Sequence, residues 1–495
     1  MTTESPARDV AIDQISRVLS WDWRTPLRIA GTTLGTSLLL GIVFGLASRP
    51  ASSQLHWGFK STVAWVVWVW ESIFGVNAVG GLKVSGSLTF FNSTLNGGIS
   101  GGAGIGAMPL TLTIITLAVA ALSFRRATRQ APSAISALML GLRAALLTAI
   151  PLFVVSVFVT LGFSDIAHLI GASGDTVQQW NSVNGDKSFS ISVSSTDAFF
   201  VSIALLAGLF AGMTLLRREW FTGRWSAVHL VLVTPVRAFG RLCVAVVVGG
   251  LGFELVTWLV RWNTSWPGGH HGPSFTLHQW INGFASAIAY GGNAGAMALG
   301  LGSLGKVGYS ASGGVAGGAF SGSSGPHQDF WIGWFARNEN LAWGIWIALL
   351  VAPAILIYVA LSIVRAHGTD ARAVLTSLGT WLVSLIVAIP VLATLANLSV
   401  GASGTVNAEA FSGNVQGNAS AGLSTLIVTF MVFVYALLIS TAIATRMGVL
   451  NRQTLGGIGS FASEISTQAH ALREERAKPA DESPAAGTDP PSSPQ

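Results

Sequence analysis

The sequence predicts an all-α integral membrane protein whose eight transmembrane helices form four helical hairpins. The 495-residue chain is 51% hydrophobic and only 10% charged, a composition that soluble domains do not have. Eight segments are also long and apolar enough to cross a bilayer, which takes about 20 helical residues. These segments lie at roughly 27–48, 106–124, 134–163, 196–216, 241–260, 341–364, 373–396 and 421–445.

Positive charge is distributed asymmetrically along this path. Twenty of the 27 lysine and arginine residues fall on one side of it, in short loops and tails beside the spans. Such an excess marks the cytoplasmic side of a membrane protein, so both termini are predicted to be cytoplasmic. The net charge of +6 therefore reports orientation in the membrane and does not indicate a nucleic-acid partner.

Two further apolar stretches, 61–79 and 280–300, are predicted not to cross the bilayer. Accepting one would invert every later loop, and accepting both would move the paired arginines of the inner loops outside. We expect both stretches at the outer interface. The first combines three tryptophans with Lys60 and Glu71, which is typical of a helix lying in the interface.

The spans and the charge pattern together define the domain organisation. A membrane domain at 27–446 separates a cytoplasmic segment, 1–26, from a cytoplasmic amphipathic segment, 447–476, and a disordered tail, 477–495. The larger loops lie outside, at about 49–105, 164–195, 261–340 and 397–420.

Each outer loop carries a segment in which residue types alternate with a period of two, the pattern of a β-strand. The clearest is 82–90, followed by 189–194, with weaker instances at 307–312 and 406–411. One interpretation is a small extracytoplasmic β layer over the helices. The other is a set of flexible loops rich in glycine and serine, and the sequence leaves both open.

One segment has the spacing of a phosphate-binding loop. Gly300-Leu-Gly-Ser-Leu-Gly-Lys306 reads as G-x-x-x-x-G-K. That motif needs a strand before it, a helix after it, and Ser or Thr after the lysine to hold Mg²⁺, but Val307 follows here. We predict no nucleotide and no other cofactor.

Histidines are the only candidate metal ligands. His270, His271, His278 and His327 share one outer loop, and neutral imidazole is a common ligand. Their spacing matches no metal signature, so solvated loop histidines are the favoured interpretation. The single cysteine, Cys243, excludes an intramolecular disulfide and a cysteine-built metal site.

Glu254 is the candidate functional residue within a span. An ionisable group inside a transmembrane segment is a functional-site hypothesis by default, and Glu254 is predicted one to two turns from the outer end of its helix. The outer side carries no close acidic pair and no H-E-x-x-H signature. We therefore predict no catalytic residue and no enzymatic activity.

The segment Gly101-Gly-Ala-Gly-Ile-Gly-Ala-Met-Pro-Leu110 leads from a glycine tract into a span, after the alternating segment 82–90. Together with the four-hairpin layout across 25–450, it resembles uncharacterised actinobacterial multi-pass membrane proteins of the streptophobe type. The resemblance implies an actinobacterial plasma-membrane location and carries over no catalytic residue.

Two classes of function stay open. The first is a non-enzymatic envelope component, a scaffold or sensor, whose outer loops bind an envelope or membrane partner. It is favoured because most of the non-membrane mass is outside, while the spans contain few charged residues. The second is a permease or exporter subunit for a small or apolar solute.

Overall fold

The computed structural model describes residues 23–49, 55–90, 93–172, 178, 185–221, 225–263, 277–316, 322–323, 327–330, 339–367, 370–408 and 411–448. The segments predicted for the two tails, including the disordered 477–495, lie outside these ranges except for 23–26 and 447–448.

Eight of the described helices are long and apolar enough to cross a membrane, which confirms the eight-span prediction. Serine or aspartate caps begin three of them: Ser133 precedes α5, Ser194 precedes α8, and the Asp370 carboxylate accepts from the backbone of α13. The eight helices are α2 Arg24–Ala47, α4 Leu110–Ala127, α5 Ala134–Phe158, α8 Ser195–Leu215, α9 Trp225–Asn263, α12 Glu339–His367, α13 Ala371–Ala396 and α14 Thr425–Arg446.

The two extra apolar stretches form helices that are not among these spans. Helix α3 (Phe59–Ser72) has 14 residues, too few for a bilayer that needs about 20. Helix α10 (Leu277–Gly302) is longer but lies across the ends of other helices. Its Asn293 side chain accepts from the first backbone N–H of α4, and Asn282 donates to the Arg49 carbonyl just after α2.

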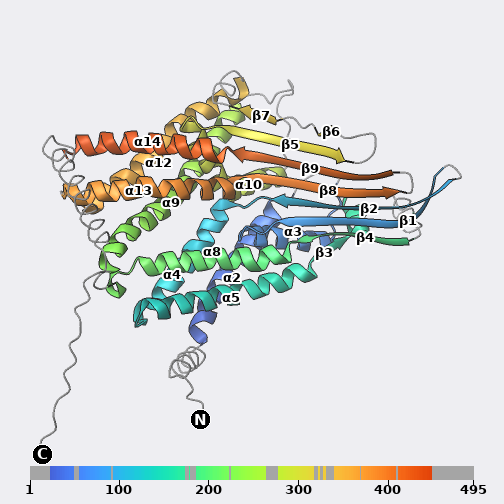
Figure 1. Ribbon diagram of the computed structural model, residues 1–495, viewed down its shortest axis with the longest axis horizontal. Helices are drawn as coiled ribbons and strands as arrows, with labels where there is room; N and C mark the ends of the chain where they lie inside the picture. The colour runs from blue at the N-terminus through green and yellow to red at the C-terminus, as the bar shows by residue number, and fades with distance from the viewer. Residues whose placement is uncertain are drawn as a thin grey trace, which may run out of the picture.

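The loops that are predicted to lie outside form one antiparallel β-sheet, so the prediction of a β layer is confirmed. The strand order is β3-β4-β1-β2-β8-β9-β5-β6, and β7 also pairs with β5. Figure 1 shows the strands continuing from one end of the helices, which we call the sheet side. The strands are β1 Ala78–Phe90, β2 Ser93–Gly106, β3 Thr160–Gly162, β4 Gly185–Val193, β5 Val307–Ala316, β6 Gly322–Ser323, β7 His327–Phe330, β8 Leu398–Ala408 and β9 Phe411–Leu423.

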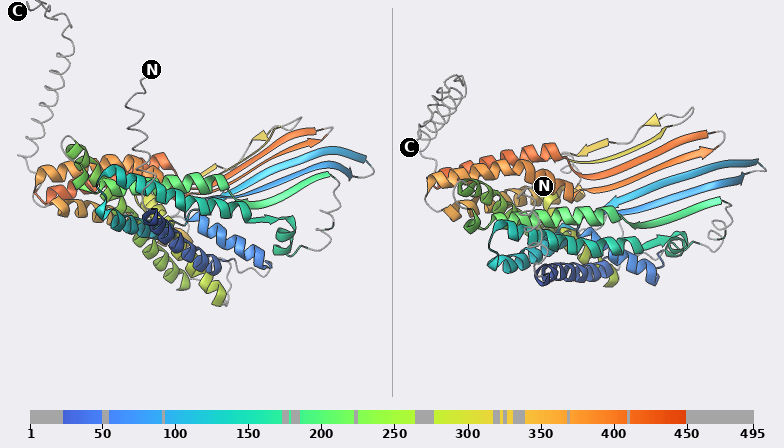
Figure 2. Two further views of the ribbon diagram at one scale, coloured as in Figure 1. Left: turned by 90° about the horizontal axis from the view of Figure 1, so that it is seen from below. Right: turned by 60° about the horizontal axis from the view of Figure 1, so that its bottom comes forward.

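The sheet is larger than the sequence pattern predicts. The alternating segments fall in β1, β4, β5 and the β8–β9 hairpin, as expected. Strand β2 contains the glycine tract 97–106, although glycine is depleted in strands. It is paired along its length, with β1 on one side and β8 on the other. Figure 2 shows the sheet extending well beyond the described helices, with α3 and the short α6 (Phe163–Leu169) near its base.

The molecule is an internal repeat of two halves. The first half runs from α2 to α8 and the second from α9 to α14. In each half a span is followed by a non-spanning helix that packs on it, α3 on α2 and α10 on α9. Strands, a span, a second span, further strands and a final span then follow in the same order. The strand order of the sheet also repeats. In the first half β3 and β4, from the second hairpin, precede β1 and β2, and in the second half β8 and β9 precede β5 and β6 in the same way.

Residue-level contacts confirm the repeat. The sequence Thr-Pro-x-Arg opens the spans at 25–28 and 234–237, an offset of about 209 residues. At that same offset, Thr32 and Arg241 make equivalent hydrogen bonds. The Thr32 hydroxyl donates to Ser123 Oγ over 3.0 Å, and Arg241 Nη1 donates to Ser362 Oγ over 2.8 Å. Ser123 and Ser362 in turn both precede the basic ends of their helices.

The last span of each half has the same buried face. Each begins after a serine, Ser194 or Ser424, whose backbone N–H bonds to the residue just before the half's first long strand, Asn77 or Lys306. Every fourth residue is then buried, as expected for one face of a helix. The buried positions are Ala198, Ser202, Leu206, Phe210 and Thr214 in α8, and Val428, Val432, Ala436, Ser440 and Ala444 in α14.

Each half has its own hydrophobic core. We call α2, α4, α5 and α8 the first bundle, and α9, α12, α13 and α14 the second bundle. One core lies mainly within the first bundle and the other mainly within the second. Helix α10 lies where they meet, with Ala289 in the first core and Leu299 in the second. The basic ends of α4 and α14 lie away from the sheet, at what we call the tail side.

Candidate functional site

The C-terminal end of α3 is inserted into the first bundle through close packing on α2. A Cβ atom at Gly41 would lie 2.5 Å from Trp70 Cβ, and one at Gly45 would lie 3.0 Å from Val66 Cα. Only glycine at these two positions allows such an approach, as the four-residue glycine spacing in α2 predicts. The indole N–H of Trp70 also donates to Ser37 Oγ on α2 over 2.9 Å.

A Schellman motif ends α3 and fixes the position of Glu71. The Val76 N–H bonds to the Glu71 carbonyl and the Gly75 N–H to the Ser72 carbonyl, with Gly75 at a φ of 80°. This pair of bonds around a left-handed residue is a common helix terminus. The motif turns the chain into β1 and leaves Glu71, the penultimate residue of the helix, inside the bundle.

The Glu71 side chain is fully buried and its carboxyl oxygens have no hydrogen-bond partner. The residue is 0% exposed, and neither Oε1 nor Oε2 is bonded to any atom that the structure describes. Removal from water disfavours the charged form of a carboxyl group. Burial accordingly raises the pKa of Glu71 to about 8, so the carboxyl is neutral at pH 7.

The second half shows what the same position looks like without a carboxyl group. Helix α10 ends in an identical motif, in which Gly305 bonds to Gly300 and Leu304 to Leu301. Gly300 is therefore the counterpart of Glu71. A Cβ atom there would lie 2.4 Å from Leu423 Cδ2 and 3.3 Å from Val428 Cγ1, so the site has no room for a side chain.

In the first half, smaller residues occupy the positions that correspond to Leu423 and Val428. At the offset that relates α8 to α14, Leu423 corresponds to Val193 and Val428 to Ala198, both buried. Two shorter side chains thus accompany the larger Glu71. The repeat itself does not require a carboxyl group here, because the second half folds in the same way with glycine.

Hydroxyl groups of α4 extend the polar character of this region. The Thr113 hydroxyl donates to the Ile73 carbonyl in the turn after Glu71 over 2.8 Å. Thr116 lies one turn further along α4, where its buried Oγ1 has no hydrogen-bond partner in the described part of the chain. In the second half, Ala352 occupies the position that corresponds to Thr113, and it packs directly against Gly302, the counterpart of Ile73.

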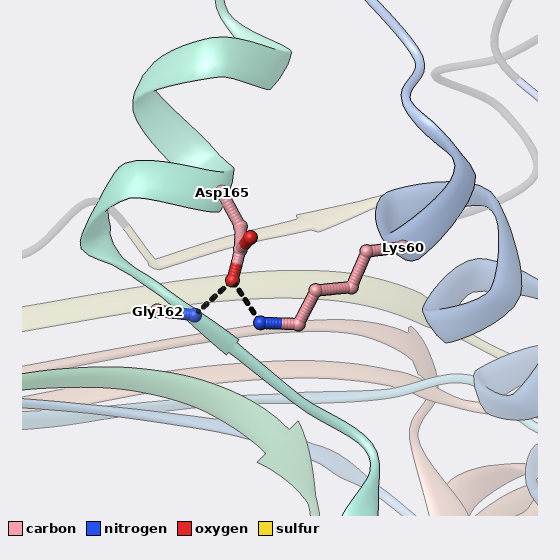
Figure 3. Close-up of polar contacts among 3 residues, drawn as sticks. All are labelled: Lys60, Gly162 and Asp165. Atoms are coloured by element: carbon pink, nitrogen blue, oxygen red, sulfur yellow. Dashed lines mark hydrogen bonds and ion pairs between the residues drawn. The ribbon is translucent and has the colours of Figure 1, made fainter.

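An ion pair holds the opposite end of α3 outside the bundle. Lys60 Nζ lies 2.5 Å from Asp165 Oδ2 on α6, and the Gly162 N–H donates to the same oxygen over 2.8 Å (Figure 3). Partial burial works to raise the pKa of Asp165, but the bonds from Lys60 and Gly162 and the lysine charge outweigh it, so the pKa is lowered. Because Lys60 is well exposed, the pair contributes little stability.

Glu254, the residue singled out from the sequence, lies in the apolar part of α9 and is half-buried. At the offset that relates α2 to α9, it corresponds to Gly45, which faces α3. Each half thus has one carboxylate in the region where its first span meets its non-spanning helix. Sequence reasoning placed Glu71 at a wet interface, and the structure corrects this. The available signal was its position inside the apolar run from Val63 to Phe74.

The histidine candidates are only partly within the described chain. His270 and His271 lie outside it. His278 is in the first turn of α10, whereas His327 is in β7, beside the strand that follows the other end of α10. Among the described residues, no group of three or more potential ligand side chains could hold a metal ion.

The segment that resembles a phosphate-binding loop has the wrong surroundings for one. A helix precedes Gly300–Lys306 and strand β5 follows it, the reverse of the order that the motif requires. Its glycines instead permit close packing, since a Cβ atom at Gly302 would lie 2.0 Å from the Ala348 carbonyl oxygen.

Comparison of the chain with protein-family models, with curated proteins and with solved structures gave no match.

Proposed function

We propose that this integral membrane protein is a non-enzymatic envelope component, a scaffold or sensor that binds an envelope partner through its sheet. The observation that carries the proposal is the nine-stranded sheet to which all four hairpins contribute. The proposed orientation follows the positive charge: both termini in the cytoplasm, the sheet outside, and an actinobacterial plasma membrane as the location.

The register of the sheet supports a binding role because it sorts residue types by row. One row across β4, β1, β2, β8 and β9 is polar or glycine, and the next is apolar or glycine. Successive rows alternate between the faces of a pleated sheet, so the register separates polar from apolar residue types. The polar row is Ser190, Gly81, Gly102, Ser403 and Gln416, and the apolar row is Ile191, Gly80, Ala103, Ala402 and Gly417.

Site-specific photocrosslinking in intact cells tests this function. Thr405 belongs to a polar row and Val406, the next residue of β8, to an apolar one. A photoreactive residue at 405 should capture one discrete envelope component, whereas the same residue at 406 is the matched control on the other face. Equal labelling from both positions, or none from either, would contradict binding through the polar face.

A permease or exporter subunit for a small or apolar solute is the second candidate, and the internal repeat specifically favours it. Many transporters consist of two structural repeats with the substrate site between them. Glu71 and Glu254 supply one carboxylate in each half. Proteoliposomes loaded with a pH-sensitive dye test this candidate: proton flux lost on Glu254→Gln would support it, and no flux above empty liposomes would exclude proton-coupled transport.

A further inference from the structure

Three features of Glu71 point to a ligand rather than to a structural role. The carboxyl group is completely buried without a hydrogen-bond partner in the described chain. Its counterpart in the repeat is Gly300, so the fold does not need it. Leu423 and Val428 leave no space for a side chain at Gly300 in the second half, and their counterparts in the first half are the smaller Val193 and Ala198. A buried charge without a partner is strongly unfavourable, whereas a neutral carboxylic acid is tolerated.

Among the residues that the structure describes, no neighbouring charge stabilises the ionised form. The elements packed against α3 are α2, α5, α6, β3 and β4, and α4 is joined to the following turn through Thr113. Their charged or titratable side chains, with those beside their ends, are Arg24, Arg28, Arg49, Arg125, Arg126, Arg143, Asp165, His168, Asp186 and Lys187. None is a hydrogen-bond partner of Glu71, and burial alone accounts for its raised pKa.

We propose that Glu71 is a proton-binding site and that protonation of its carboxyl group lets the C-terminal end of α3 stay in the first bundle. Release transfers the proton to water and leaves a carboxylate, which is less stable inside the bundle than where water reaches it. Loss of the proton therefore favours departure of the end of α3 from the bundle. The Lys60–Asp165 pair retains the other end of the helix, so the motion is a hinged opening that reaches β1 directly through Gly75.

The direction of the pH effect follows from linkage. The docked state keeps its proton up to about pH 8, whereas an exposed glutamate loses it near 4.3. Between those values the docked state binds more protons than the open state, so opening becomes about tenfold more favourable per pH unit. The gradient should flatten above pH 8, where both states are ionised.

Hydrogen exchange on the full chain in lipid nanodiscs tests the coupling. After correction for the intrinsic exchange rate, the protection of amides in 63–76 should fall about tenfold per unit between pH 5.5 and 8. Glu71→Gln, which stays neutral, should remove this dependence, and Glu71→Met should do the same if the Gln variant does not fold. Glu219→Gln is the matched control, since Glu219 is an exposed carboxylate on the tail side.

Infrared spectroscopy tests proton occupancy independently. A carboxylic-acid carbonyl band that is present at pH 7, diminishes around pH 8 and is absent from Glu71→Gln would support the proton site. A Glu71 carboxylate already ionised at pH 7 would overturn it. Protection that falls equally in Glu71→Gln would overturn the coupling to α3.

Discussion

The two halves of the molecule share an architecture but differ in the chemistry of their interiors. The end of α3 enters the first bundle with Glu71, Trp70 and a turn bonded to Thr113. The end of α10 meets the second bundle with Gly300, Gly302 and Gly305, packed backbone against backbone. A fold that forms with glycine does not require a buried carboxyl group. The carboxyl group of Glu71 is therefore not a requirement of the architecture that the two halves share.

The same contrast runs through the spans. Buried hydroxyl residues of the first bundle correspond to apolar residues of the second at the repeat offsets. Most of these hydroxyls bond to a carbonyl of their own helix, as Thr33 does to Ile29 and Thr214 to Phe210, so they are satisfied without water. Examples are Thr33 and Leu242, Ser37 and Val246, Thr113 and Ala352, Ser202 and Val432, and Thr214 and Ala444.

The severest way to break this comparison is to move the carboxyl group to the other half. Gly300→Glu would force a side chain into Leu423 and Val428 and bury a carboxyl group without a partner there. We expect a loss of about 2–6 kcal/mol, combining overpacking with an unsatisfied polar group, and hence little folded protein by size-exclusion chromatography. Gly283→Glu is the control on the same helix, because Gly283 is exposed and a Cβ atom there contacts nothing within 4 Å. Normal folding of Gly300→Glu would show that the two sites are not different.

The converse change should abolish a pH dependence. The raised pKa of Glu71 means that the native state binds the extra proton, so wild-type stability should decrease as pH rises from about 4.5 to 8. The total decrease should approach about 5 kcal/mol, at about 1.4 kcal/mol per pKa unit. Glu71→Gly with Val193→Leu and Ala198→Val copies the second half and should give a flat profile in thermal unfolding. A variant that kept the wild-type slope would assign the titration to another group.

Exchanging the left-handed residues of the two helix ends should have a smaller effect. Gly75 and Leu304 occupy equivalent positions with φ of 80° and 62°, a conformation that costs a side-chain-bearing residue about 1–2 kcal/mol. Gly75→Leu should lower the stability of the first half by about that amount or more. Leu304→Gly should stabilise the second half by up to about 1 kcal/mol. Chemical denaturation in detergent measures both, and opposite signs are the decisive result.

The ion pair at the outer end of α3 should matter least. Lys60→Gln removes the pair with Asp165 and should change stability by less than about 1 kcal/mol, because the lysine is exposed. The pKa of Asp165 is lowered in the folded protein. The contribution of this carboxylate to stability is therefore present above the ordinary pKa of an aspartate and is lost as the pH falls below it. A differential hydrogen-exchange comparison at low and high salt checks this, and a large salt-independent loss would contradict it.

The sequence allows prediction of the parts of the fold that the membrane dictates. A span must be apolar for about 20 residues, and all eight were predicted for that reason. Alternation also revealed the strands at 82–90 and 189–194. The strand order could not be predicted, because β2 pairs with β8 across nearly 300 residues of the chain. Because β2 is rich in glycine, its sequence lacks the alternation of apolar and polar residues that predicts a strand.

The candidate site could not be predicted because the pattern of apolar residues in a helix does not show how deeply that helix is inserted among its neighbours. Glu71 follows three tryptophans and a lysine on a short helix, a pattern shared by interfacial helices and by helices that end inside a bundle. Only the close approach of Trp70 to Gly41 distinguishes the two. The repeat escaped detection for a related reason. Its halves share Thr-Pro-x-Arg and a few serines, while the buried positions changed from hydroxyl to aliphatic residues.

The pairing of β2 with β8 has a consequence for how the protein is made. It joins the two halves along ten pairs of residues, from Gly97–Ala408 to Gly106–Ser399. During synthesis at about 5–20 residues per second, the nearly 300 residues between them take roughly 15–60 s to appear. The first half must therefore wait on the sheet side with an open strand edge, which is a site for wrong association. Biogenesis of this protein should depend on a chaperone or on rapid translation through the second half, and slowing translation between α8 and α13 should increase aggregation.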